Sequence, residues 1–203
     1  MDSLIPNIIR FVVVLLALTI HEFSHALAAL LSGDKTAKDT GRLTLNPISH
    51  LDIIGTIMLM VGPIGWAKPV PINPYNFRNP KWNMFFVSIA GVGSNLLLAL
   101  ICGLIVRIIG IRNLNDGVQL VVFYIIFINC GLAIFNLLPL PPLDGSKVFA
   151  SILPKKIAHA LETINPMIPI IVLIIIIATP LRMVISIPVY LLVKLFSGIW
   201  VGV

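Results

Sequence analysis

Charged residues are scarce in this sequence: only 11% of its 203 residues are Asp, Glu, Lys or Arg, whereas 58% are hydrophobic. A soluble globular domain carries about 25% charged residues, so this composition excludes an ordinary soluble fold. Several apolar stretches are long enough to cross a hydrocarbon layer about 30 Å thick. The sequence therefore predicts an all-α polytopic membrane protein, a helical bundle of about four to six transmembrane segments.

Cysteine is also rare. Cys102 and Cys130 both fall in apolar segments and neither belongs to a CxxC pair, which argues against a cysteine-based metal site and predicts that both are small packing residues. The net charge of +6 could indicate a nucleic-acid partner, but the basic residues cluster between apolar spans. Membrane topology explains that clustering better, so no nucleic-acid partner is expected. The N-terminus lacks the basic stretch of a cleaved signal peptide, and none is expected.

The apolar runs and their breaks predict the order of elements. Residues 53–65 are short for a crossing and rich in Gly and Pro, which favours a re-entrant segment. Arg42–Leu45 alternates as a strand would, so a small re-entrant β/loop region is expected there. Complete spans are expected over residues 4–32, 83–111 and 118–138, an amphipathic helix over 146–163, and either one kinked span or two spans over 167–200.

The basic residues of the loops predict the orientation of the chain. The 33–81 region holds six Lys or Arg residues and the 146–163 region holds three, whereas the 112–117 loop holds a single arginine. The positive-inside rule places the first two regions in the cytoplasm and the 112–117 loop outside. This arrangement requires that residues 51–66 do not cross the membrane, which agrees with a re-entrant segment.

The motif His21-Glu22-Phe23-Ser24-His25 places ionisable side chains inside the first apolar span. Such groups are costly at membrane depth and are functional candidates by default. On a helix, positions 21 and 25 lie on one face, so both imidazoles can reach one metal ion, and Glu22 can reach a water molecule beside it. Two histidines with an intervening glutamate are the arrangement of zinc peptidases. Alternatively, His21 and His25 could be hydrogen-bonded core residues.

A catalytic zinc site usually has a third protein ligand. Asp144 is the best candidate, because it follows the third span at the expected cytoplasmic end, at a depth comparable to that of His21 and His25. The three side chains would then lie nearer the cytoplasmic face. Alternatively, Asp144 could be the N-cap of the helix that follows it. His50 lies in a loop and is expected to brace that loop rather than to bind a metal.

The motifs together resemble those of a known family. The segment His21–His25, the glycine-rich Gly91-Val-Gly-Ser-Asn95, and Asn136 followed by Asp144-Gly145 resemble the site-2 proteases, which are intramembrane zinc metalloproteases of peptidase family M50B. The similarity covers about residues 5–150 and corresponds to a short form without PDZ or CBS domains. It implies one intramembrane metalloprotease domain over residues 1–203, with a catalytic core at about 5–150 and C-terminal helices at about 151–203.

This resemblance implies roles for individual residues. His21, His25 and Asp144 are expected to bind one zinc ion, and Glu22 is expected to be the catalytic acid/base. Asn95 and Asn136 match family asparagines and are expected to position the substrate or to support an oxyanion. Alternatively, both asparagines could simply hydrogen-bond between helices, and Gly91 and Gly93 are expected to let helices approach closely.

The resemblance further implies that the substrate is a single-span membrane protein, cleaved within its transmembrane segment during regulated intramembrane proteolysis. The enzyme would be a multi-pass protein of the cell membrane, in contact with the lipid bilayer, and its oligomeric state is left open. An irregular segment within residues 43–80 could offer a strand edge to the unwound substrate. The alternatives are a membrane metal-ion transporter and a non-catalytic zinc-binding membrane protein.

Overall fold

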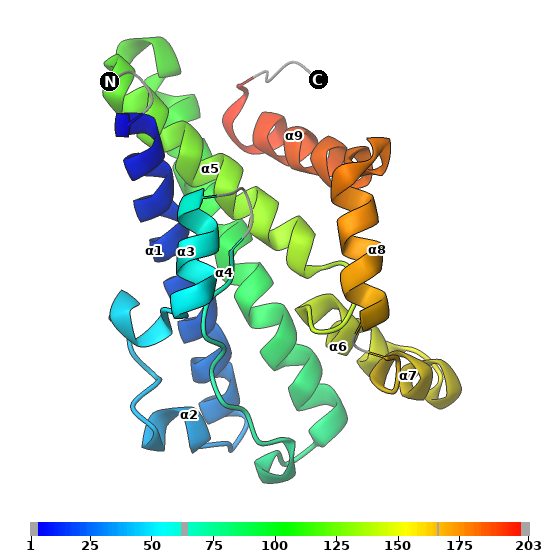
Figure 1. Ribbon diagram of the computed structural model, residues 1–203. Coiled ribbons are helices and arrows are strands. Elements are labelled where there is room, and N and C mark those ends of the chain that lie inside the picture. The colour runs from blue at the N-terminus through cyan, green and yellow to red at the C-terminus, as the bar shows by residue number, and fades with distance from the viewer. Residues whose placement is uncertain (1–3, 62–64, 166, 200–203) are drawn as a thin grey trace.

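The computed structural model describes residues 4–61, 65–165 and 167–199 of the chain (Figure 1). These residues form an all-α structure, as predicted, and contain no strand. The only β-type pairing within them is an isolated antiparallel bridge between Leu51 and Ala67. Its elements are α1 (Leu4–Leu31), α2 (Thr36–Asp39), η1 (Pro47–His50), α3 (Ile53–Val61), η2 (Pro74–Asn76), α4 (Pro80–Ile109), η3 (Ile111–Asn113), α5 (Asp116–Asn136), α6 (Asp144–Ile152), α7 (Lys155–Glu162), α8 (Met167–Ala178), η4 (Pro180–Arg182) and α9 (Met183–Ser197).

The strand expected at Arg42–Leu45 is wrong. The backbone N–H groups of Arg42 and Leu43 donate to the carbonyl oxygen of Ala37 at 2.8 and 3.2 Å, which folds the chain back onto α2. The carbonyl oxygen of Thr44 lies 2.8 Å from Nε2 of His50. Local contacts therefore satisfy this backbone, and it has no partner strand. His50 is buried and braces the loop, as predicted.

Turn and cap residues explain where the long helices begin and end. Helix α1 stops two residues before Gly33, which has φ of 105°. The side chain of Asn79 accepts a hydrogen bond from the Trp82 N–H at the start of α4. The side chain of Asn115 likewise accepts one from the Val118 N–H at the start of α5. These caps satisfy backbone donors that an unpaired helix end would leave open.

Helix α4 lies at the centre of the bundle and contacts α1, α5, α6 and α9 (Figure 1). Its small apolar residues pack with residues of α5 and α9 in the main apolar core. Cys130 is completely buried within this core and Cys102 packs against it, so both cysteines are packing residues, as predicted. The antiparallel pair α4 and α5 is joined by the short connection at η3, also as predicted.

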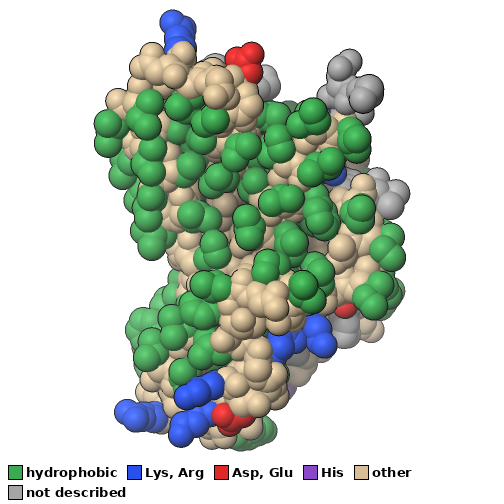
Figure 2. Space-filling view, turned by 90° about the vertical axis from the view of Figure 1, so that its left-hand side faces the viewer, with side chains coloured by type: hydrophobic (Ala, Val, Ile, Leu, Met, Phe, Trp, Pro, Cys, Tyr) green, Lys and Arg blue, Asp and Glu red, His purple; other side chains and the backbone are tan. Residues whose placement is uncertain are grey.

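Within the described part of the chain, four helices are long and apolar enough to cross a membrane: α1, α4, α5 and the segment Pro180–Ser197 that includes α9. Helix α3 has 9 residues and is not one of these four, and residues 62–64 of the expected re-entrant segment lie outside the described residues. Figure 2 shows hydrophobic side chains over much of one face, and a gathering of Lys and Arg side chains at the end that bears α2. This distribution is typical of a membrane protein with one basic rim.

The C-terminal region differs from the prediction in one respect. The single amphipathic helix expected over 146–163 is wrong, because the structure has two helices, α6 and α7, separated at Leu153 and Pro154. Proline lacks a backbone N–H and disfavours a helical conformation in the residue before it, so α6 ends here. Further along, residues 167–199 form two helices, α8 and α9, separated at Pro180, but only the segment Pro180–Ser197 is long enough to span, so neither one kinked span nor two spans is found there.

Candidate metal centre

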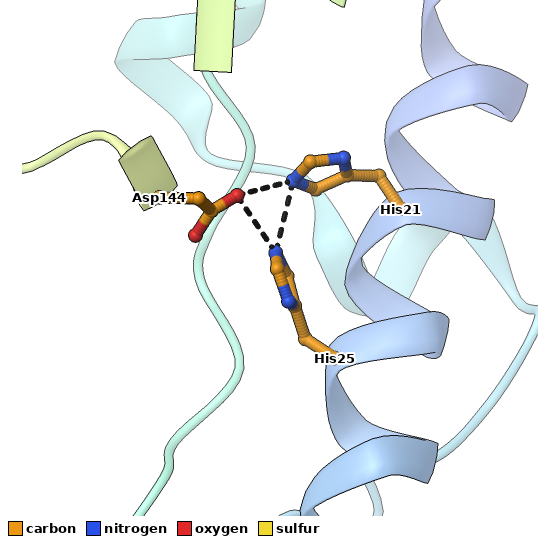
Figure 3. A group of neighbouring side chains, drawn as sticks. All are labelled: His21, His25 and Asp144. Atoms are coloured by element: carbon orange, nitrogen blue, oxygen red, sulfur yellow. Dashed lines mark hydrogen bonds and ion pairs between the residues drawn. The ribbon is translucent and has the colours of Figure 1, made fainter. Parts of the chain in front are cut away.

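The structure brings His21, His25 and Asp144 together, although Asp144 is more than a hundred residues away in sequence (Figure 3). Oδ2 of Asp144 lies 3.1 Å from Nε2 of His21 and 3.0 Å from Nε2 of His25. The two Nε2 atoms are 3.0 Å apart. All three residues are buried. The geometry thus juxtaposes three ligand-type atoms at the corners of a small triangle.

This triangle fits a tetrahedral zinc ion. Ligand atoms at about 2.0–2.1 Å from a zinc ion lie about 3.3–3.4 Å from one another at the tetrahedral angle. The observed separations of 3.0–3.1 Å are a few tenths of an ångström shorter. Two imidazole nitrogens and one carboxylate oxygen are also a usual donor set for zinc. Among the described residues this is the one group of three or more such side chains within mutual reach.

Helix geometry and a glycine allow the two imidazoles to converge. His21 and His25 are one turn apart on α1, so their rings project from the same face. That face packs against Gly91 of α4, where a Cβ atom would lie 2.5 Å from Nε2 of His25 and 2.7 Å from Nε2 of His21. Only a residue without a side chain leaves room for both rings at this crossing. The close approach expected at Gly91 is confirmed, whereas at Gly93 it is wrong, because no atom lies within 4 Å of that Cβ position.

Each imidazole is held from behind through Nδ1. Nδ1 of His25 lies 2.7 Å from the backbone carbonyl oxygen of Val87. Nδ1 of His21 lies 2.7 Å from Oδ1 of Asn95. Because a carbonyl oxygen accepts only, His25 carries its proton on Nδ1 and turns the lone pair of Nε2 toward Asp144. Such contacts fix the ring orientation that a metal ligand requires.

Asp144 enters the site from the first residue of α6. The N-cap of that helix is Leu143, so the N-cap alternative for Asp144 is wrong, and its carboxylate faces the histidines. Gly145 fixes the backbone here, because a Cβ atom at this position would lie 2.3 Å from the carbonyl oxygens of Leu137 and Leu138. The turn after α5 therefore packs tightly against the start of α6 and aims Asp144 at α1.

Glu22 lies beside the triangle and is also buried. Its Oε2 atom accepts a hydrogen bond of 2.8 Å from the backbone N–H of Val70. Val70 belongs to an extended segment that Arg42 holds through Nη2, which donates to the carbonyl oxygens of Lys68 at 2.7 Å and Pro69 at 3.3 Å. Sequence reasoning missed this contact, which depends on two segments that are distant in the chain.

A cleft of about 340 Å³ opens onto these side chains. Asn136 lines this cleft, and its Nδ2 atom donates to the carbonyl oxygen of Leu132 in its own helix at 3.0 Å. Asn95 lies elsewhere: it is completely buried behind His21 and hydrogen-bonds to α1 and α5. The structure thus places Asn136 on the cleft wall and Asn95 in the interhelical packing.

Asn129 of α5 was not singled out from the sequence, although it accepts the hydrogen bond from Asn95 at 2.7 Å. The sequence does point to Asn129, because its amide interrupts an otherwise apolar span. Polar residues at membrane depth are seldom without a partner or a function.

Comparison with known proteins finds sequence relatives of this chain. Residues 103–179 match the model of "Peptidase family M50", a range that includes Asn136 and Asp144. The chain is 42% identical over 158 residues to "Putative zinc metalloprotease YwhC" of Bacillus subtilis, with 75% of this chain and 71% of that protein covered. It is 30% identical over 141 residues to "Putative zinc metalloprotease Rip2" of Mycolicibacterium smegmatis, covering 64% of this chain and 52% of that protein.

The Rip2 protein of Mycobacterium tuberculosis is similar at 31% identity over 139 residues, and the chain again spans 52% of its length. No solved structure matches the chain. The identity to YwhC extends over more than two thirds of both proteins. The chain therefore belongs to the site-2 protease family, peptidase family M50.

Proposed function

We propose that this chain is an intramembrane zinc-dependent endopeptidase of the site-2 type, which cleaves the transmembrane segments of single-span membrane proteins. The observation that carries the proposal is the buried triangle of His21, His25 and Asp144 with Glu22 beside it, because His21, Glu22 and His25 lie on α1, which is long and apolar enough to cross a membrane. The names of YwhC and Rip2 as zinc metalloproteases support it.

His21, His25 and Asp144 would hold one zinc ion per chain. A zinc ion supplies Lewis-acid activation of water and of a peptide carbonyl at neutral pH. The two Nε2 atoms come from α1 and Oδ2 of Asp144 comes from α6, and all three residues line the cleft, from which water or substrate would reach the ion. A site with three protein ligands and one open position is the catalytic rather than the structural type of zinc site.

Glu22 would move the proton. Val70 holds Oε2 by its backbone N–H, and no described residue donates to Oε1. Oε1 can therefore accept a proton from water and later deliver it to the leaving amine. Asn136, on the cleft wall, has an amide proton that its hydrogen bond to Leu132 does not use and that can reach toward a bound carbonyl oxygen.

The same features support a proposed substrate and setting. A cleft at membrane depth admits a peptide that is itself in the bilayer, and that peptide must unwind locally to expose its carbonyl groups. We propose that the chain is a multi-pass protein of the cell membrane. The basic rim would face the cytoplasm by the positive-inside rule, which puts the metal centre nearer that face.

The test is cleavage of single-span peptides by the purified protein in detergent. The wild-type protein should cleave, a chelator should abolish cleavage, and zinc should restore it. Glu22→Gln should retain zinc but lose at least about 100-fold in turnover, because it removes general acid–base catalysis. Asp39→Asn, at an exposed position on α2, serves as the control and should cleave normally.

Other outcomes favour the alternative functions. A transporter or a scaffolding protein has no need of Glu22, so metal transport or partner binding that survives Glu22→Gln without any peptide cleavage would contradict the protease. If the zinc ion is purely structural, the protein should likewise bind zinc, cleave no peptide, and be unaffected by Glu22→Gln.

A further inference from the structure

We propose that Asn129 is a positioning residue for the metal centre, and that it fixes the tautomer of His21 through Asn95. The inference rests on the proposed zinc-binding role of His21. Asn129 lies outside both the His21–His25 motif of α1 and the Asn136–Asp144 segment, so the inference adds a residue to this site.

Three side chains form a continuous relay across three helices. Nδ2 of Asn129 donates to the carbonyl oxygen of Ile125 at 2.8 Å. Nδ2 of Asn95 donates to Oδ1 of Asn129 at 2.7 Å. Oδ1 of Asn95 lies 2.7 Å from Nδ1 of His21. The relay thus begins at a backbone group of α5, passes through α4 and ends at an imidazole of α1.

Backbone carbonyl groups determine the direction of this relay. The Ile125 carbonyl can only accept, so the amino group of Asn129 must face it, and Oδ1 of Asn129 must face Asn95. The amino group of Asn95 then faces Oδ1 of Asn129, and it also lies 3.3 Å from the Ala17 carbonyl oxygen, a second group that only accepts. Oδ1 of Asn95 is therefore left for His21, whose Nδ1 must carry the proton.

The tautomer matters because only an unprotonated Nε2 can bind a metal ion. If the amide of Asn95 were reversed, its amino group would face Nδ1 of His21 and the ring proton would move to Nε2. The lone pair of His21 would then point away from His25 and Asp144. The reversal would also set the oxygen of Asn95 against two acceptors, the oxygens of Asn129 and Ala17.

Burial makes the hydrogen bonds of this relay essential for the two asparagines. Asn95 and Asn129 are 0% and 1% exposed. Asn129 borders an apolar cavity of about 440 Å³ between α1, α4 and α5, whose other lining residues all have hydrophobic side chains. No other polar side chain on that wall can replace Asn129 as the acceptor for Asn95. Burial of two amides is costly unless their hydrogen bonds are made, and here they are made in one pattern.

The two histidines differ in how they are held. Nδ1 of His25 contacts a backbone carbonyl oxygen directly, so no side-chain substitution on α5 can reverse it. Nδ1 of His21 depends on two side-chain amides, each of which can rotate. The inference therefore predicts that α5 controls the metal affinity of the site through His21 alone.

The experiment measures zinc affinity by competition with a chromophoric chelator, and the absorption spectrum of the Co²⁺-loaded protein. Asn129→Leu keeps the branched shape and the number of side-chain heavy atoms but removes the acceptor. Asn129→Ser is a second, smaller variant, whose hydroxyl can bond to its own helix as those of Thr19 and Ser24 do, and which is too short to reach Asn95. Both variants should weaken zinc binding by about 10- to 100-fold, as loss of an outer-shell partner does, and should change the Co²⁺ spectrum.

Two matched variants separate this role from simple packing. Asn129→Asp should remain protonated in its apolar surroundings, accept from Asn95 and donate to Ile125, so zinc affinity should stay within about threefold of wild type. Thr19→Val removes a buried hydrogen bond within α1 and should leave both zinc affinity and spectrum unchanged.

The outcomes distinguish this inference from the proposed function. If wild-type protein binds zinc but Asn129→Leu and Asn129→Ser bind it equally well, the relay is overturned and the zinc site stands. An equal loss of affinity in Asn129→Asp or in Thr19→Val would also overturn it. If wild-type protein does not bind zinc at all, the proposed function itself fails.

Discussion

Gly91 and His25 are in such close contact that a Cβ atom at position 91 would lie 2.5 Å from Nε2 of His25. The helix crossing that carries the metal centre thus depends on the absence of one side chain. The same Cβ atom would lie 2.6 Å from Cε1 of His21, so a methyl group there would displace both rings.

Gly91→Ala should therefore impair the metal centre. Overpacking of a buried contact costs about 1–3 kcal/mol, and here the rings that must move are the candidate ligands. We expect weaker zinc binding, a lower unfolding temperature and loss of peptide cleavage, measured on the purified protein in detergent.

Gly93→Ala is the matched control, two residues away on the same helix. Nothing lies within 4 Å of its Cβ position, and the residue is exposed. Alanine is the better helix former by about 0.5–1 kcal/mol, so this variant should be neutral or slightly more stable. Equal zinc affinity in Gly91→Ala and Gly93→Ala would contradict the proposed packing.

Asp144→Asn should remove the response of the protein to zinc. A ligand that binds only the folded state stabilises it, so zinc should raise the unfolding temperature of the wild-type protein. An amide has no negative charge to offer the ion, and the zinc-induced shift should largely disappear. Asp116→Asn, at an exposed position at the start of α5, should keep the full shift. A normal shift in Asp144→Asn would remove Asp144 from the ligand set.

The parts of the site that could be predicted from the sequence are those that depend on local geometry. His21 and His25 are one turn apart, so their common face follows from the helix period alone. Asp144 could be proposed only from the depth of its span and from the family motif, because nothing local joins it to α1. Its arrival there depends on the tight packing of Gly145 against Leu137 and Leu138.

The contacts that could not be predicted join segments distant in sequence. The Val70 N–H reaches Glu22 across 48 positions, and its position depends on how Arg42 holds the segment. Asn95 could be identified as a polar residue in a span, but the face of α4 that it occupies is set by packing, which places it behind His21 rather than in the cleft. The strand expected at Arg42–Leu45 failed because four alternating residues specify no partner strand.

Arg42→Ala should loosen the segment that contacts Glu22. Loss of its hydrogen bonds to the carbonyl oxygens of Lys68 and Pro69 costs about 1 kcal/mol, which corresponds to a roughly fivefold larger population of the open segment. We expect faster hydrogen exchange of peptides that cover residues 66–72, measured by mass spectrometry. Lys38→Ala removes an exposed cation from the neighbouring α2 and should not change this exchange. Unchanged exchange in Arg42→Ala would show that other contacts hold the segment.

Asp34 should make the stability of the loop region depend on pH. This carboxylate is completely buried beyond the end of α1 and accepts hydrogen bonds from the N–H of Asn73 at 2.7 Å, from Nδ2 of Asn76 at 2.7 Å and from Thr36. Burial raises the pKa of Asp34, but the hydrogen bonds from Thr36, Asn76 and Asn73 outweigh it and hold that pKa below its ordinary value.

A lowered pKa in the folded state means that the unfolded state binds the proton more readily. The stabilisation from Asp34 is therefore complete above the unfolded pKa of about 3.9 and is lost as the pH falls through the lower folded value. Asp34→Asn puts an amino group where the Asn73 N–H needs an acceptor, and should cost about 1.5–3 kcal/mol at neutral pH. The difference in unfolding free energy between wild type and variant should stay constant from pH 7 to about 5 and shrink below about pH 4. Asp39→Asn, at the exposed end of the neighbouring α2, should show no such difference. A difference between wild type and Asp34→Asn that persists unchanged at pH 2–3 would contradict the assignment.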